Sequence, residues 1–256
     1  MGGRLTDTVK TLLIANVLFF FGTAYIGDYA FKVFALWFPE NENFAIWQIV
    51  THMFMHGNTT HIFFNMFMLF IFGSVMEQSI GQKRFIFLYV SAGLGAAALQ
   101  ILFNYINFTG AYQAYIEAGY NDEYIRDTLE YTAQMKDRMK ISSGVPKEVT
   151  ETLVTSYLSS MVGASGAIFG LLAGFAMLYP NLPLYLMFIP IPIKAKYLIG
   201  AYFLMDVYAA VTGASLLGES NIAHWAHIGG AIVGFFMVYF WKKKTILKIG
   251  GINLSY

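Results

Sequence analysis

Two polar side chains that can do chemistry lie inside runs of small and apolar residues. Ser165 belongs to the run GASGAIFG, and His227 belongs to the run AHIGGAIVG. A serine hydroxyl beside an imidazole is the pair that nucleophilic hydrolysis requires, because the imidazole takes the hydroxyl proton and later returns it to the leaving group. We therefore predict Ser165 as a nucleophile and His227 as its general base and acid.

Small residues recur every four positions beside each of these two side chains. One stripe comprises Gly166, Gly170 and Gly174, and the other comprises Ala226, Gly230 and Gly234. Residues four apart share a helical face, and small residues there let two helix backbones approach closely. Such stripes are most often packing devices only. The joint occurrence of a serine on one and a histidine on the other favours a site, since ionisable groups in membrane helices are commonly functional.

The composition is that of a polytopic membrane protein. Of the 256 residues, 57% are hydrophobic and only 12% are charged, and the mean hydropathy is +0.55. The net charge of +1 gives no reason to expect a nucleic-acid partner. The chain has no cysteine, which excludes disulfides, thiol catalysis and cysteine metal sites.

The apolar runs predict an all-α fold with six membrane spans. The spans are expected at about residues 11–26, 61–75, 85–106, 165–180, 197–210 and 222–241. Residues 27–60 mix apolar and charged side chains and are predicted to lie at the membrane interface as short amphipathic pieces. Residues 108–155 hold just over half of the acidic side chains and are predicted as a solvent-exposed helical insertion between spans three and four.

The distribution of basic residues predicts that both termini are cytoplasmic. With that orientation ten basic side chains lie inside: Arg4, Lys10, Lys83, Arg84, Lys194, Lys196, Lys242, Lys243, Lys244 and Lys248. Six lie outside: Lys32, Arg126, Lys136, Arg138, Lys140 and Lys147. This excess follows the positive-inside rule. The spans that carry His61, Ser165 and His227 then all run inward from the outer face, so the three side chains are expected at a similar depth.

The second span supplies candidate donors for a reaction oxyanion. His61 and Asn65 are four residues apart and therefore share a helical face. We predict that both stabilise the oxyanion, together with the N–H of Ser165 at the start of its helix. Asp206 is an acid in the fifth predicted span. We expect it to pair with a polar neighbour and not to reach His227.

Four patterns give the chain a resemblance to the rhomboid intramembrane serine proteases. The matching residues are Gly163 to Gly166 for Gly-x-Ser-Gly, Ala226, His227, Gly230 and Gly234 in the last span, His61 and Asn65 in the second, and His52 and His56 upstream of it. The resemblance implies one protease domain over residues 1–256, with residues 108–155 as an extracytoplasmic insertion.

The resemblance also implies an activity and a location. Rhomboid proteases cleave membrane-anchored proteins near the outer end of their spans, through a serine-histidine dyad without an acid and behind a gate formed by span five and the loop before span six. We expect the cell membrane as the location, transmembrane proteins and the lipid bilayer as partners, and no cofactor or metal. Two positions depart from the pattern: Gln48 follows Trp47 where the family often has arginine, and Phe169 replaces a more familiar tyrosine.

Three other functions are compatible with parts of this pattern. An inactive rhomboid-like scaffold would bind membrane segments without cutting them, but it has no need of Ser165 or His227. A transporter would show broken helices in two related halves, and no internal repeat is present in the sequence. A metal site could use His52, His56, His61 and His224, although no carboxylate accompanies them at ligand spacing.

Overall fold

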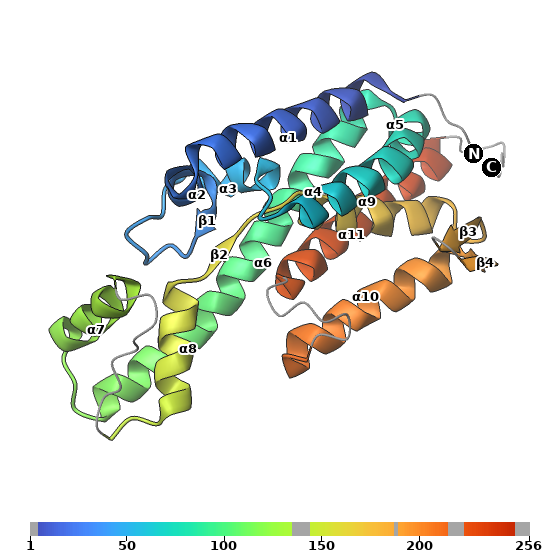
Figure 1. Ribbon diagram of the computed structural model, residues 1–256. Coiled ribbons are helices and arrows are strands. Elements are labelled where there is room, and N and C mark those ends of the chain that lie inside the picture. The colour runs from blue at the N-terminus through green and yellow to red at the C-terminus, as the bar shows by residue number, and fades with distance from the viewer. Residues whose placement is uncertain (1–4, 135–143, 187–188, 215–222, 249–256) are drawn as a thin grey trace.

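The computed structural model is a bundle of long helices with a smaller group of helices at one end (Figure 1). The structure describes residues 5–134, 144–186, 189–214 and 223–248. The helices are α1 Asp7–Ile26, α2 Asp28–Phe34, α3 Gln48–Thr51, α4 Thr59–Met68, α5 Ser74–Ile80, α6 Gln82–Glu117, α7 Asp122–Gln134, α8 Lys147–Tyr157, α9 Ser165–Leu178, α10 Ala195–Thr212 and α11 His224–Lys248. A 3₁₀ turn, η1 (His52–Phe54), follows α3, and a π-helical turn, η2 (Leu69–Gly73), joins α4 to α5.

Short strands connect the first loop to the segment that precedes α9. Strand β1 (Leu36–Trp37) pairs antiparallel with β2 (Ser160–Met161), and a second hairpin of β3 (Pro183–Leu186) and β4 (Ile189–Lys194) precedes α10. In the first pair, Leu36 lies opposite Met161. The loop predicted between spans one and two is therefore hydrogen-bonded, through β1 and β2, to the backbone that precedes Ser165.

The helices α6, α9 and α11 form the centre of the bundle, and they meet through their small residues. A methyl group added at Gly230 would collide with the carbonyl oxygen of Gly166, and one added at Gly170 would lie 2.9 Å from the carbonyl oxygen of Gly230. The predicted contact between the two small-residue stripes is confirmed. Methyl groups added at Gly170 and Gly166 would also collide with the Cβ atoms of Ala92 and Ala96, so α6 packs closely against the same stripe.

A buried acid joins the first two long helices at the end of the bundle away from Ser165. The carboxylate of Glu77 on α5 accepts hydrogen bonds of 2.5 to 3.2 Å from the Thr6 and Thr8 hydroxyls and the Val9 N–H. These groups lie at or next to the first turn of α1, where backbone N–H groups lack helical partners and the helix dipole favours an anion. Glu77 therefore caps α1 in place of a local side chain.

Gln48 organises the first loop, at the position where the resemblance would favour arginine. Its side chain is 1% exposed, and its oxygen accepts hydrogen bonds from the backbone N–H groups of Trp37 and Ala45. Its amide nitrogen lies 2.8 Å from the carbonyl oxygen of Asn43 and 3.2 Å from two further carbonyls, those of Lys32 and Val33. A neutral amide can both donate and accept, so Gln48 bonds to backbone N–H groups as well as to backbone carbonyls. A guanidinium has no acceptor and could bond only to the carbonyls.

The insertion differs from the prediction at its start. Residues 108–117 continue α6 without a break, so α6 extends past the other long helices and carries α7 and α8 beside its protruding end (Figure 1). These helices share a separate apolar core in which Tyr115, Ile125 and Leu153 are fully buried. The Tyr115 and Thr150 hydroxyls lie 2.8 Å apart within it. Residues 135–143 of the predicted insertion lie outside the described residues.

Three helical stretches in the described part of the chain are long and apolar enough to cross a membrane, judged by length and composition. They are Asp7–Ile26, Thr59–Ile80 and Gln82–Glu117, and the apolar helix α9 is shorter, at 14 residues. Rows of aromatic and aliphatic side chains on these helices are exposed, Phe21 by 66% and Phe87 by 63%. Apolar surface of this kind suits contact with lipid and agrees with an integral membrane protein.

Candidate active site

Ser165 lies at the first residue of α9, where the chain turns sharply out of β2. Gly163 makes this turn with a φ of +121°, which side-chain-bearing residues rarely adopt, and its N–H donates a 2.8 Å hydrogen bond to the carbonyl oxygen of His52. The first loop thus fixes the backbone two residues before the serine. Because α9 begins at Ser165, the first N–H groups of this helix have no helical partners and provide positive potential beside the hydroxyl.

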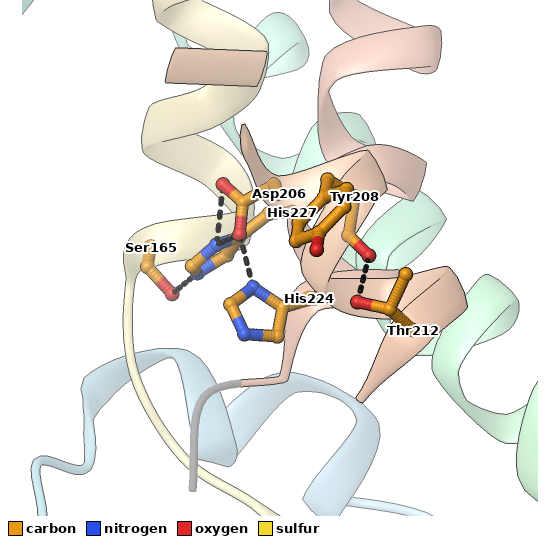
Figure 2. A network of polar contacts seen from close by, with 6 residues as sticks. All are labelled: Ser165, Asp206, Tyr208, Thr212, His224 and His227. Carbon is orange, nitrogen blue, oxygen red and sulfur yellow. Dashed lines mark hydrogen bonds and ion pairs between the residues drawn. The ribbon is translucent and has the colours of Figure 1, made fainter. Parts of the chain in front are cut away.

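The structure brings Ser165 and His227 together. The Nε2 atom of His227 lies 2.8 Å from the Ser165 Oγ, and the histidine is 7% exposed (Figure 2). His227 lies in the first turn of α11, as Ser165 does in α9, so the contact between the two stripes also sets the contact between the two side chains. The predicted proximity of the two groups is confirmed.

Phe169 supports the imidazole from one side. The two rings are stacked, with centroids 4.1 Å apart and planes 12° from parallel. Phe169 lies one turn after Ser165 on the same face of α9. It also contacts Tyr202 of α10, at a centroid distance of 5.0 Å. The stacking expected at this position is therefore present with phenylalanine.

His61 and Asn65 lie on α4 beside the serine loop. A methyl group added at Gly163 would lie 2.7 Å from His61 Nε2 and 3.7 Å from Ser165 Oγ, so the imidazole and the hydroxyl border the same small space. The Asn58 side chain caps this helix by accepting from the His61 N–H. Asn65 is 6% exposed, and its amide donates to the His61 carbonyl oxygen. The structure thus brings His61 to the pair, while the Asn65 amide bonds to its own helix.

Asp206 corrects an expectation from the sequence, because it does reach His227. Both carboxylate oxygens lie 3.2 Å from the Nδ1 of His227, and Oδ1 also makes a close contact with the Nδ1 of His224 (Figure 2). The helix α10 lies against α9 and α11 and turns this side chain toward them, so it is 4% exposed. Two signals point to this cluster: an acid inside an apolar helix, and histidines at i and i+3 of α11.

His52 and His56 lie near the serine loop but contribute no contact to Ser165. The Nδ1 of His52 lies 2.8 Å from the Gln48 carbonyl oxygen, and the His56 ring meets the His61 ring edge to face at 5.1 Å. Burial lowers the pKa of each to about 4, mainly because the charged imidazolium loses its hydration. Neither ring nitrogen of His56 has a hydrogen-bond partner among the described residues. Both side chains are therefore neutral near pH 7.

One cluster in the described part of the chain has donors that could hold a metal ion. Donor atoms of Asp206, His224 and His227 lie within 4.8 Å of one another. The four-histidine set considered from the sequence is not assembled in this way, since His224 lies with Asp206 and not with His52 or His56. The hydrogen bonds from the two imidazoles to the carboxylate account for this cluster without an ion.

A bundle of apolar helices, with a partly buried serine-histidine pair at the starts of α9 and α11, is the arrangement of a membrane protein with a site of the serine-hydrolase kind. The sequence matches the Rhomboid domain over residues 43–116 and 139–244, well over half of the chain. The chain belongs to the rhomboid family of intramembrane proteases.

Individual relatives are identical to the chain at a quarter to a third of the aligned positions. It is 27% identical over 199 residues to the rhomboid protease AarA of Providencia stuartii, covering 73% of this chain and 53% of that protein. It is 31% identical over 94 residues to the rhomboid protease GlpG of Salmonella choleraesuis, covering 36% of this chain and 34% of that protein. An uncharacterized mitochondrial rhomboid protein of Schizosaccharomyces pombe is 25% identical over 221 residues, which are 80% of this chain and 54% of that protein. The chain spans about half the length of these relatives or less.

Proposed function

We propose that this chain is an intramembrane serine endopeptidase that cuts membrane-anchored proteins near the outer end of their spans. The 2.8 Å contact between His227 Nε2 and Ser165 Oγ is the observation that carries the proposal. A hydroxyl at position 165 is not required for helix packing, because alanine there would keep the close approach of α9 and α11. The names of the relatives, which include rhomboid proteases, support the same activity.

The reaction is acyl transfer to Ser165 followed by hydrolysis. The Ser165 Oγ attacks the carbonyl carbon of the peptide bond while its proton passes to His227 Nε2. The tetrahedral intermediate then expels the amine, which takes that proton from His227. Water, deprotonated by the same imidazole, attacks the acyl-enzyme, and the carboxylic product leaves as Ser165 regains its proton.

The oxyanion is stabilised by three kinds of donor near Gly163. The N–H of Ser165 at the start of α9, the His61 imidazole and the Asn65 carboxamide all belong to elements that border this space. A carboxamide nitrogen carries two hydrogens, so the bond from Asn65 to the His61 carbonyl leaves one for a substrate. Donors held in place before the reaction stabilise charge as it develops.

The topology proposed for this activity has six spans in the cell membrane with both termini in the cytoplasm. Helices α1, α4 to α5, α6, α9, α10 and α11 supply the spans. His61, Ser165 and His227 each lie within the first turn of their helices, which supports a common depth near the outer face. Residues 1–256 then form one protease domain, with α7 and α8 outside the membrane.

The proposed partners of the protein are transmembrane protein substrates and the bilayer, with no nucleic acid, cofactor or metal. The loop at residues 215–222, which the resemblance assigns to a gate, lies outside the described residues.

Labelling with a fluorophosphonate probe tests the activity directly. The purified wild-type protein is expected to react covalently at Ser165 and to cleave a transmembrane substrate in liposomes. Ser165→Ala should fold normally, judged by thermal stability, and should lose both properties. A catalytically inactive scaffold, the second function considered, would bind the substrate without labelling or cleavage in either form. Cleavage by Ser165→Ala at a wild-type rate would overturn the assignment.

A further inference from the structure

A buried carboxylate lies between two imidazoles at the rim of the proposed active site. Asp206 receives His227 Nδ1 at 3.2 Å from both of its oxygens, and His224 Nδ1 contacts its Oδ1 (Figure 2). The Asp206 side chain is 5% exposed, and the side chains of His224 and His227 are 16% and 9% exposed. A carboxylate in such a position is costly unless hydrogen-bond donors satisfy it. The two imidazoles are the donors that the described residues provide.

The geometry of the three groups fixes how the protons on His227 must be arranged. A neutral imidazole carries one proton, on Nδ1 or on Nε2. The ionised carboxylate can only accept, so a hydrogen bond to it requires the proton on Nδ1. The lone pair of Nε2 then faces the Ser165 hydroxyl, 2.8 Å away. This is the tautomer that can remove the serine proton.

We propose that Asp206 is a positioning residue that acts through His227, so that the site operates as a serine-histidine-aspartate relay anchored by His224. The inference rests on the proposed protease function and replaces the acid-free dyad that the resemblance implies. When Ser165 attacks, His227 becomes an imidazolium whose Nδ1–H donates to the Asp206 carboxylate. The opposite charges lie in a site shielded from water, where their attraction is strong.

His224 holds the carboxylate in this orientation. It lies three residues before His227 on α11, and the two rings meet at 88° with centroids 6.3 Å apart. Because their Nδ1 atoms approach the same carboxylate from different directions, rotation of Asp206 away from His227 would also break the contact with His224. The acid comes from α10 and the two histidines from α11, so the relay requires these two helices to stay in contact.

Asp206→Asn is the informative substitution because it preserves size and removes the negative charge. The carboxamide nitrogen can donate to His227 Nδ1 and so favours the tautomer with the proton on Nε2, which cannot accept from Ser165. We expect kcat and the rate of fluorophosphonate labelling to fall by at least about 10²-fold. KM and thermal stability should stay near wild type, whereas a purely structural role would change stability first.

Thr212→Val provides the matched control on the same helix. The Thr212 hydroxyl donates to the Tyr208 carbonyl oxygen and lies away from His227 (Figure 2). This variant should retain wild-type kcat and labelling.

Asp206→Glu keeps a carboxylate and should recover part of the rate lost in Asp206→Asn. His224→Phe removes only the contact between His224 Nδ1 and the Asp206 carboxylate. It should lower kcat by roughly 10-fold, since Asp206 is then held less firmly while His227 is unchanged.

Nitrogen NMR of ¹⁵N-histidine-labelled protein gives a readout that folding defects do not mimic. The His227 signals, assigned by their loss in His227→Phe, should show the Nδ1–H tautomer in the wild type and the Nε2–H tautomer in Asp206→Asn. An unchanged tautomer, or a kcat within about threefold of wild type in both Asp206→Asn and His224→Phe, overturns the relay. If Ser165→Ala cleaves substrate in the same assay, the proposed function fails instead, whatever Asp206 does.

Discussion

At the scale of single residues, the proposed site depends on three side chains that lie within one turn of a helix start. Ser165 begins α9, His61 is the third residue of α4, and His227 is the fourth of α11. Side chains near a helix start lie beside backbone N–H groups that have no helical partner. The proposed reaction would therefore take place where the backbone presents hydrogen-bond donors and positive potential without a cationic side chain.

Removal of the proposed oxyanion donors tests this arrangement. His61→Ala and Asn65→Ala should each lower kcat by about 10²-fold, with KM little changed, because these side chains act on charge that develops during the reaction. Steady-state cleavage of a transmembrane substrate in liposomes measures both quantities. If neither substitution changes kcat, the oxyanion is stabilised by other groups.

Phe169 offers a test of the ring that supports His227. Phe169→Leu removes the 4.1 Å stacking contact, which is worth about 0.5 to 1.5 kcal/mol in aromatic pairs, so kcat should fall by up to roughly 10-fold. Phe169→Tyr keeps the ring and should retain most of the activity. Equal activity in the Leu and Tyr variants would show that stacking does not orient the imidazole.

His56 should make stability depend on pH. Its pKa is about 4 in the folded protein against an ordinary value of 6.5, so between these values the unfolded chain binds a proton that the folded chain does not. The contribution of His56 is full above pH 6.5, falls as the pH drops toward 4, and levels off below that, with a loss of about 3 kcal/mol from this side chain. His52, whose pKa is lowered to the same value, adds a loss of similar size. Thermal unfolding in detergent from pH 7 to pH 4 measures the slope. His56→Leu should reduce the slope to roughly half, because His52 still contributes, whereas an identical slope would contradict the assignment to His56.

At the scale of elements, contacts between glycines determine how closely α9 and α11 approach. Gly230 lies against the Gly166 carbonyl, and Gly234 lies against Gly170. Without side chains at these positions, the two helix backbones come into direct contact, and the pair Ser165 and His227 lies at the end of that contact. The packing of the two stripes therefore also sets the distance between Ser165 and His227.

Gly230→Ala should lower stability by about 1 to 3 kcal/mol or more, because the added methyl group collides with backbone that cannot move aside. Gly200→Ala on α10 is the matched control, since nothing lies within 4 Å of its added methyl group and alanine favours a helix by about 1 kcal/mol. Thermal unfolding should show opposite shifts for the two variants. A Gly230→Ala protein as stable as wild type would mean that the two helices do not pack in this way.

The sequence predicted these elements well where spacing alone decides the outcome. The four-residue repeats fixed which faces of α9 and α11 meet, and so predicted the neighbours Ser165 and His227. It predicted Asp206 poorly, because the direction in which a mid-helix side chain points depends on how α10 packs against two other helices. It also did not show that the helix of the third predicted span continues through residue 108 to Glu117, since the apolar pattern weakens there.

At the scale of the whole molecule, the bundle and the group formed by α7, α8 and the end of α6 have separate apolar cores. The bundle core contains Ala164, Ala167 and Leu171 around the serine helix, while the second core contains Tyr115, Ile125 and Leu153. The two are joined by the continuous helix α6 and by the strand pair that precedes Ser165. Changes to α7 should therefore reach the site only weakly.

Replacement of residues 121–145 by a short flexible linker tests this independence. We expect Ser165 to react with the fluorophosphonate probe within about threefold of the wild-type rate, because His227, His61 and Phe169 keep their contacts. Thermal stability should fall, since Ile125 and Leu129 leave the second core. A shortened protein that keeps its helicity but no longer reacts with the probe would place part of the machinery in the insertion.

The length of α6 limits which membrane-anchored substrates could reach Ser165. At 1.5 Å per residue its 36 residues span about 54 Å, roughly 24 Å more than the apolar thickness of a bilayer. Helices α7 and α8 pack on the protruding part and so stand above the outer membrane surface in the proposed topology. A folded domain on a substrate would meet them unless an extended tether of about seven residues separated it from the membrane. The protein would then choose among substrates by tether length as well as by the sequence at the cut.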